Sequence, residues 1–126
     1  MKITVIGAGN VGYHLSQRLK EMGHTIVQVF SRRTDKVLRI SKIVGAEPID
    51  NLASVNGKAD LYILAVKDDA IGLVAEKLAK KLHKTAWIVH TSGATPSTIL
   101  AAHFYNYGIF YPLQTFSIAR MPDFLT

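Results

Sequence analysis

The sequence contains no cysteine, which excludes a disulfide framework, thiolate chemistry and any metal site built on cysteine ligands. A chain without disulfides suits a reducing compartment, and we expect a cytoplasmic protein. No apolar run approaches the roughly 20 residues that a membrane-spanning helix needs, so we expect no membrane contact. Lys2 leads directly into a strand pattern, which leaves no room for a signal peptide.

Two further signatures of catalytic or metal sites are missing. The five histidines form no His-x-x-x-His or His-x-Glu pair, so the sequence predicts no metal site. Gly93 follows Ser92 directly and no glycine precedes the serine at the right offset, which excludes a G-x-S-x-G nucleophile elbow.

Positive charge, by contrast, is in excess. Fifteen lysines and arginines against nine acidic residues give a net charge of +6, which favours anionic partners such as a dinucleotide, other phosphates or nucleic acid. The basic residues are dispersed over several predicted helices without an aromatic-interleaved stripe, and this pattern disfavours nucleic acid.

A glycine-rich turn near the N-terminus is the most informative motif. The apolar residues 3–6 predict a buried strand, and the G-x-G-x-x-G pattern of Gly7, Gly9 and Gly12 follows at once. Gly7 permits the tight turn, Gly9 lets a pyrophosphate approach the backbone, and Gly12 allows close packing of the next helix. The free N–H groups of that helix face the phosphates. The motif predicts a dinucleotide site; the alternative is a tight turn that needs glycine for packing only.

Strand and helix patterns alternate along the rest of the chain, which predicts an α/β Rossmann-like fold with one domain across residues 1–126. We expect a doubly wound, mainly parallel sheet in the strand order 3-2-1-4-5-6, with helices on both faces. Either Asp68 or Asp69 is expected to cap the third helix. The first helix is expected to bury four apolar residues at helical spacing: Val11, Leu15, Leu19 and Met22. Later strands are predicted at residues 25–30, 47–49, 60–66, 85–89 and 107–110.

The end of the second predicted strand bears on the choice of cofactor. NAD-binding folds commonly place an Asp or Glu about twenty residues beyond the glycines, where it accepts a hydrogen bond from the ribose 2′-hydroxyl. This chain has Ser31, Arg32, Arg33 and Thr34 there instead. Guanidinium groups bind phosphate in a bidentate manner, so the sequence predicts NADP(H) rather than NAD(H), with Arg32 on the 2′-phosphate and the other three as helpers. The alternative is a solvated basic turn before the next helix.

A polar turn follows the fifth predicted strand. Because parallel strands bring ligand-binding loops together at their carboxyl ends, His90 and Ser92 are expected to open into the same crevice as the glycine turn. We predict these two residues as the catalytic candidates, with Ser92 as a hydrogen-bond donor to substrate. The alternatives are a histidine satisfied by local backbone and a serine that caps a turn.

Four motifs in this order give a resemblance to a known family. They lie at residues 6–12, 65–71, 90–94 and 111–116. With them the chain resembles the N-terminal domain of NADP oxidoreductases grouped near pyrroline-5-carboxylate reductase, deazaflavin-dependent NADP reductase and the 6-phosphogluconate dehydrogenase-like enzymes. The resemblance implies that His90 and Ser92 lie near the nicotinamide and the substrate. It also implies contacts to NADP(H) from Gly7, Gly9, Asn10, Val11, Gly12, Ser31, Arg32, Ala65, Val66 and Lys67.

The resemblance further implies a longer protein. Relatives continue into a helical domain that closes over the nicotinamide and supports dimerisation, whereas this chain ends at Thr126. We therefore expect the cofactor-binding domain of an NADP-dependent oxidoreductase, homodimeric at full length, which by itself binds NADP weakly and turns over poorly. Its substrate would be a small molecule such as an imine, ketone, hydroxy acid or deazaflavin. The alternative is a non-catalytic NADP-binding sensor or regulatory module, because the sequence shows no unambiguous acid, base or covalent nucleophile.

Overall fold

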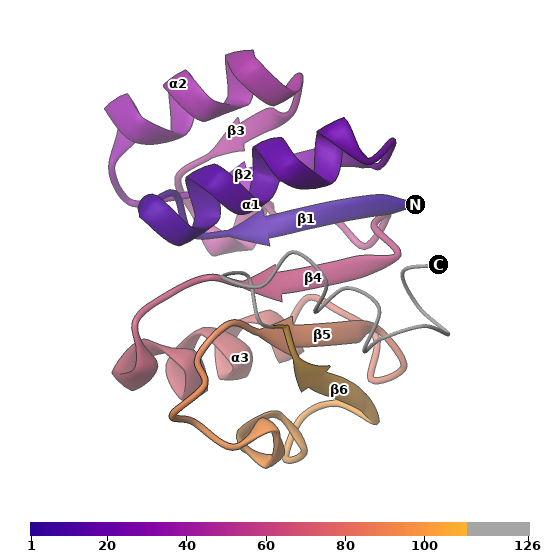
Figure 1. Cartoon of the computed structure of the whole chain (residues 1–126). Coiled ribbons are helices and arrows are strands. Elements are labelled where there is room, and N and C mark those ends of the chain that lie inside the picture. The colour runs from indigo at the N-terminus through magenta and orange to yellow at the C-terminus, as the bar shows by residue number, and fades with distance from the viewer. Residues whose placement is uncertain (111–126) are drawn as a thin grey trace.

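The computed structural model describes residues 1–110, and the motif at residues 111–116 lies outside them. Six strands form one sheet in the order β3-β2-β1-β4-β5-β6, and every strand pair within the described residues is parallel (Figure 1). The predicted order is confirmed. It reverses between β1 and β4, the place at which open parallel sheets bind ligands. The strands are β1 (Lys2–Ile6), β2 (Thr25–Phe30), β3 (Glu47–Ile49), β4 (Leu61–Leu64), β5 (Trp87–His90) and β6 (Asn106–Ile109).

Helices cover both faces of the sheet, as the sequence predicts. α1 (Asn10–Glu21) and α2 (Thr34–Val44) pack on one face, and α3 (Ile71–Ala79) packs on the other (Figure 1). None of the helices within residues 1–110 is long and apolar enough to cross a membrane. Three short 3₁₀ helices lie in the connections: η1 (Leu52–Ser54), η2 (Asp68–Ala70) and η3 (Ser97–Leu100).

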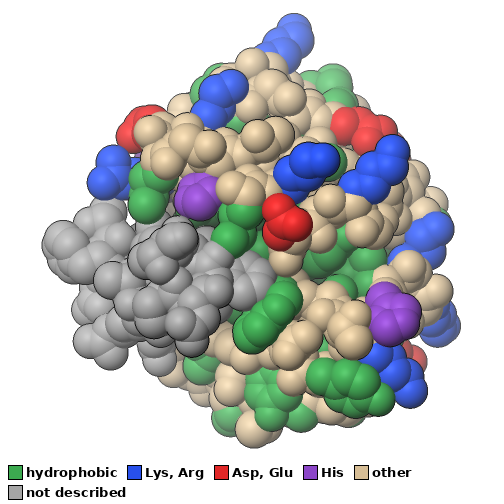
Figure 2. All heavy atoms as spheres, turned by 90° about the vertical axis from the view of Figure 1, so that its right-hand side faces the viewer, with side chains coloured by type: hydrophobic (Ala, Val, Ile, Leu, Met, Phe, Trp, Pro, Cys, Tyr) green, Lys and Arg blue, Asp and Glu red, His purple; other side chains and the backbone are tan. Residues whose placement is uncertain are grey.

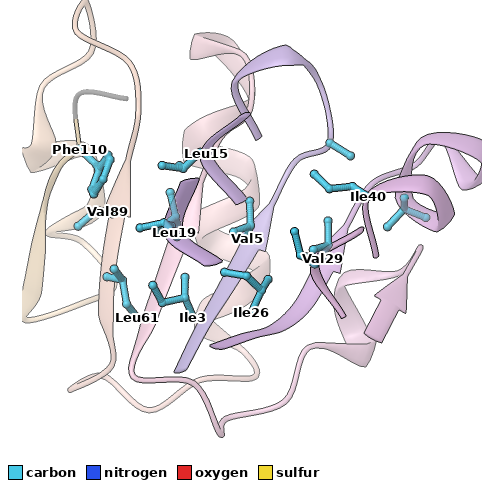
Figure 3. Packing of buried hydrophobic residues seen from close by; sticks show 14 residues of the cluster. Ile3, Val5, Leu15, Leu19, Ile26, Val29, Ile40, Leu61, Val89 and Phe110 are labelled. Carbon is cyan, nitrogen blue, oxygen red and sulfur yellow. The ribbon is translucent and has the colours of Figure 1, made fainter. Parts of the chain in front are cut away.

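Successive side chains of each strand point to opposite faces of the sheet, so the buried core forms two clusters. On β1, Val5 belongs to the cluster under α1 and α2, whereas the next residue, Ile6, belongs to the cluster under α3. In the first cluster, Leu19 of α1 and Ile40 of α2 lie over the strand residues (Figure 3). All four residues of β4 are buried, which is the expected behaviour of a central strand covered on both faces.

The buried face of the first helix overlaps the predicted one in part. Leu15 and Leu19 are buried as expected, but Val11 and Met22 are 37% and 41% exposed, so their predicted burial is wrong. The buried face is turned towards the residues after Val11, which leaves Val11 and Met22 at its margin. The buried face includes the small residues Gly12 and Ser16 instead.

The predicted aspartate cap of α3 is also wrong. Asp68 and Asp69 form η2, and Ala70, which precedes α3, makes no side-chain capping bond. The Ala70 N–H donates to the Lys67 carbonyl at 2.9 Å. A backbone bond of the 3₁₀ type therefore takes part of the role that a capping carboxylate would have at this helix start.

A buried amide holds the connection between β3 and β4. Gln28 Nε2 donates to Glu47 Oε1 (2.8 Å) and to the Ser54 carbonyl (3.0 Å), and Gln28 Oε1 accepts from the Asn56 N–H (3.0 Å). Gln28 itself is 1% exposed. Because a buried amide is costly unless it is fully bonded, these contacts fix the path of the connection across the sheet.

The Tyr62 hydroxyl secures the same connection from β4. It donates to the Asn56 carbonyl (2.7 Å) and accepts from the Ala59 N–H (3.3 Å). Burial raises the pKa of the Tyr62 phenol, since the charged form is disfavoured there. The hydroxyl therefore stays protonated and able to donate throughout the neutral range.

The substitution Tyr62→Phe tests this contact. It keeps the buried ring but leaves the Asn56 carbonyl and the Ala59 N–H without their side-chain partner, so we expect the free energy of unfolding to fall by about 1–3 kcal/mol in urea denaturation. The control is Tyr105→Phe, because Tyr105 is 70% exposed and its change should stay within about 0.5 kcal/mol. Equal stability of the two variants would contradict the assignment.

Candidate functional site

The loops that follow β1, β2, β4 and β5 meet at the carboxyl edge of the sheet. Gly7 N–H donates to the last carbonyl of β2 (2.8 Å), and Ala65 N–H donates to the last carbonyl of β1 (2.8 Å). Thr91 N–H donates to the last carbonyl of β4 (3.2 Å). Each loop therefore begins with a bond to the neighbouring strand. The structure brings the glycine turn, residues 31–34, residues 65–67 and residues 90–92 to one edge.

Two glycines of the turn are required by close backbone packing. Gly7 has φ +124°, a conformation that L side chains rarely adopt, and a Cβ placed on it would overlap the Ala65 carbonyl oxygen. A Cβ placed on Gly12 would overlap the Gly7 carbonyl oxygen. The start of α1 is therefore packed directly on the turn, and the turn directly on the loop after β4.

The middle glycine has a different environment. A Cβ placed on Gly9 would meet no protein atom within 4 Å. Gly9 is also the N-cap of α1, makes no side-chain capping bond, and has no acidic residue in the first turn after it. The first N–H groups of α1, at Asn10 and Val11, thus lie at an open helix end with positive electrostatic potential. Both side chains are exposed.

The four residues after β2 have separate surroundings. Ser31 is buried, and its hydroxyl accepts a hydrogen bond from the Arg33 N–H (3.0 Å). Arg33 Nε lies 3.6 Å from Asp35 Oδ1, in an exposed ion pair over the first turn of α2. Thr34 is exposed at the start of that helix. Arg32 is exposed and forms no ion pair with any residue of the described part of the chain.

A groove of about 470 Å³ lies beside Arg32. Phe30 and Leu52 give it an apolar part, and four cations and one carboxylate line it together with Asn51 and Ala53. We call it the basic groove; its charged residues are Arg32, Lys77, Lys80, Lys81 and Asp50.

The lysines of the basic groove were not predicted as site residues, because a basic end of a helix is usually a solvated one. Their spacing did carry a signal, because positions i, i+3 and i+4 of a helix lie on one face, although α3 ends at Ala79 and only Lys77 lies within it. The chain order could not show that these lysines line the same groove as Arg32.

Elsewhere the charge is more dispersed. Figure 2 shows the face at which the strands begin, and lysine and arginine side chains are distributed over it with acidic, apolar and uncharged groups between many of them. This face shows no continuous basic stripe outside the grey residues.

His90 is completely buried at the end of β5, and the backbone occupies both of its ring nitrogens. The Ser92 N–H donates to Nδ1 (3.1 Å), so Nδ1 carries no proton, and the Nε2–H then donates to the Pro96 carbonyl (3.2 Å). The ring holds residues 91–96 in a closed loop. This geometry favours the alternative assignment from the sequence, a histidine satisfied by local backbone.

Ser92 builds the second part of that loop. Its hydroxyl donates to Thr95 Oγ1 (3.2 Å) and accepts from the Ala94 N–H (3.3 Å). The side chain is 9% exposed, so a small part of it remains at the surface of the site. The bonds that it makes here are those of a turn-capping serine.

The loop after β4 completes the edge. Ala65 and Val66 are partly buried beside the glycine turn, and Lys67 is exposed before η2. Val66 Cγ1 would lie 3.5 Å from a Cβ on Gly7, so this side chain adjoins the turn itself. Residues 1–110 contain no group of three or more histidine, aspartate or glutamate side chains that could hold a metal ion.

Comparison with known proteins places this geometry in a family. The Rossmann-like domain family matches residues 1–112. The chain belongs to this family. The Rossmann-like domain is similar to the crystal structure of a candidate NADP oxidoreductase from Bacteroides fragilis, with 37% identity and a TM-score of 0.84 over 90% of this chain and 44% of that one.

Two further solved structures share the fold. Pyrroline-5-carboxylate reductase from Coxiella burnetii is 23% identical with a TM-score of 0.70, covering 82% of this chain and 39% of that one. Prephenate dehydrogenase from A. aeolicus, solved with hydroxyphenyl propionate and NAD+, is 17% identical with a TM-score of 0.71, covering 82% and 40%. The chain thus spans less than half the length of each of the three proteins. The resemblance found in the sequence motifs is confirmed.

Alanine substitutions separate the roles of two glycines in the Rossmann-like domain. Gly7→Ala forces a left-handed φ on an L residue and a clash with the Ala65 carbonyl, so we expect a loss of more than about 2 kcal/mol in urea denaturation. Gly9→Ala adds a methyl group into open space and should cost less than about 1 kcal/mol. Similar losses in the two variants would show that Gly9 is also a packing residue.

The loop function of His90 is tested by His90→Phe. A phenyl ring cannot bond the Ser92 N–H or the Pro96 carbonyl. The exposed Pro96 carbonyl keeps its bond from the Ile99 N–H (3.3 Å), but the buried Ser92 N–H is left unpaired, which should lower the free energy of unfolding by about 1–3 kcal/mol. His83→Phe is the matched control. His83 is exposed and its ring bonds only Thr85, so this substitution should cost less than about 1 kcal/mol. A His90 variant as stable as the control would refute this function.

Proposed function

We propose that this Rossmann-like domain binds NADP(H) for an oxidoreductase and positions the nicotinamide for hydride transfer to or from a small substrate. The observation that carries the proposal is the open, uncapped start of α1 above Gly9. When bound, the cofactor supplies the hydride chemistry. The residues of this chain then have to bind it, orient it and select its phosphates.

The glycine turn fits the diphosphate. A diphosphate needs N–H donors that no side chain occupies and a backbone that no Cβ shields, and Gly9, Asn10 and Val11 offer both. The packing of Gly7 and Gly12 holds these donors at a fixed position next to the loop after β4. Ala65, Val66 and Lys67 on that loop would then run along the cofactor.

The residues after β2 fit a 2′-phosphate. The chain has Ser31 where NAD-binding folds commonly have an acidic residue, so no carboxylate at that position repels the extra phosphate. Two unit charges about 4 Å apart interact by about 4 kcal/mol at an effective dielectric constant of about 20, enough to decide the choice of cofactor. Arg32 has no ion pair among the described residues and is available to bind the phosphate. Arg33 forms an ion pair with Asp35, and Ser31 and Thr34 add hydroxyl donors.

The loop after β5 has a positioning function in this proposal. His90 holds the loop through both ring nitrogens, and the loop in turn presents Ser92 at the carboxyl edge of the sheet. The hydroxyl of Ser92 would reach substrate only by exchanging its bond to Thr95. The substrate pocket would be completed by a helical domain outside this chain, which would also form the dimer. This is supported by the length of the Bacteroides relative, of which the chain spans 44%.

A second candidate is a non-catalytic NADP-binding sensor or regulatory module. The occupied ring nitrogens of His90 favour it, because they leave the residue without a free acid or base group. Both functions need the same cofactor site. Consumption of NADPH by a panel of imines and ketones, measured with the full-length protein, separates them: turnover supports the oxidoreductase, and tight binding without turnover supports the sensor.

Arg32→Gln tests cofactor selection. Loss of a charge-assisted bond to the 2′-phosphate should weaken NADPH binding about 10- to 100-fold, while NADH binding stays within about twofold, as measured by calorimetric titration. Arg39→Gln removes an exposed arginine of α2 and should change neither affinity. Gly9→Ala should weaken both cofactors alike, since it acts at the shared diphosphate. A parent protein that binds neither cofactor, or binds NADH as tightly as NADPH, would refute the proposal.

A further inference from the structure

We propose that Lys77, Lys80 and Lys81 form a second phosphate-selecting wall opposite Arg32, so that the adenosine 2′-phosphate end of NADP(H) is held in the basic groove between β2 and α3. This inference rests on the proposed function and extends it. It assigns part of cofactor selection to the helix after β4, on the opposite face of the sheet from α2.

The position of the basic groove supports this assignment. It is continuous with the loop after β2, because Phe30 at the end of β2 and Arg32 just beyond it both line it. Its other side is the C-terminal end of α3 and the residues after it. A ligand that binds Arg32 therefore lies against one of the residues that line the groove.

The shape and lining of the groove fit a nucleoside with a phosphate. Its volume of about 470 Å³ lies within the range of small-ligand sites. Phe30 and Leu52 offer apolar surface to a purine base, and the Asn51 side chain, whose Oδ1 accepts from the Ala53 N–H (2.9 Å), keeps its amide hydrogens for a ligand. Asp50 is an acceptor and suits a ribose hydroxyl or an adenine amino group.

The charge balance of the groove calls for an anion. Four cations line it against the single carboxylate of Asp50. Within residues 1–110, the ion pairs are Arg18 with Glu21 and Arg33 with Asp35, so none of the four cations is neutralised by a described acidic side chain. Cations this close repel one another, and a dianionic phosphate would relieve that repulsion.

The helix dipole alone does not account for these lysines. Cations near a helix C-terminus interact favourably with its negative end wherever they lie around the helix. Lys77, Lys80 and Lys81 instead all line the groove, Lys77 from the last turn of α3 and the other two from the turn that follows it. Lys84, which follows shortly in the chain, does not line it.

A triple substitution tests the inference: Lys77→Gln, Lys80→Gln and Lys81→Gln in one protein. We expect it to weaken NADPH and adenosine 2′,5′-bisphosphate about tenfold, since each exposed ion pair contributes modestly, and to leave NADH and 5′-AMP within about twofold. The charge-matched control is Lys42→Gln, Lys58→Gln and Lys84→Gln, three exposed lysines outside the groove, which should not change the preference. Thermal unfolding monitored by circular dichroism checks that both variants are folded.

The outcomes separate this inference from the proposed function. If the parent chain prefers NADPH and loses the preference in Arg32→Gln, but the groove triple behaves like its control, then the lysine wall is refuted and the proposed function stands. If the parent chain has no affinity for either cofactor, the proposed function fails first. A selective loss of affinity for NADPH and for the bisphosphate in the groove triple, but not in its control triple, confirms the wall.

Discussion

The packing of one backbone on another at Gly7 is the constraint on which the rest of the site depends. Gly7 lies against the carbonyl of Ala65, and Gly12 lies against the carbonyl of Gly7, so the loop after β4, the turn after β1 and the start of α1 are stacked without side chains between them. This stacking occurs at the point where the sheet reverses its order. It leaves the first N–H groups of α1 beside an open space and fixes where that space is.

Three buried polar side chains that hold the connections of the sheet are satisfied by hydrogen bonds, and this contrasts with the open helix end. Gln28 and Tyr62 bond the connection before β4, and His90 bonds the loop after β5 through both ring nitrogens. Such networks make the supporting loops rigid, because breaking any of these bonds would leave a buried group unpaired. The N–H groups at the start of α1 lie instead, uncapped, at the edge at which a ligand can enter.

The fold also localises positive charge. The net charge of +6 is a property of the whole chain, but two neighbouring arginines have different surroundings in the structure. Arg33 is taken up by Asp35, whereas Arg32 faces the basic groove beside three lysines that are far away in the sequence. The net positive charge attracts anions to the whole molecule. The fold adds a local site for them at the basic groove, where the connection before β4 leaves a hollow next to α3.

The sequence by itself determined the strand order and the special role of Gly7, because apolar periodicity and glycine geometry are local properties of the chain. Its errors also had local causes: Val11 and Met22 fit the helical period but lie at the margin of the buried face, and η2 replaced the aspartate cap. Only the tertiary structure decided that the His90 ring is occupied on both sides and that Lys77, Lys80 and Lys81 line the same groove as Arg32. Both facts depend on contacts between segments whose relative placement arises only when the helices pack on the sheet, and no residue pattern along the chain records that placement.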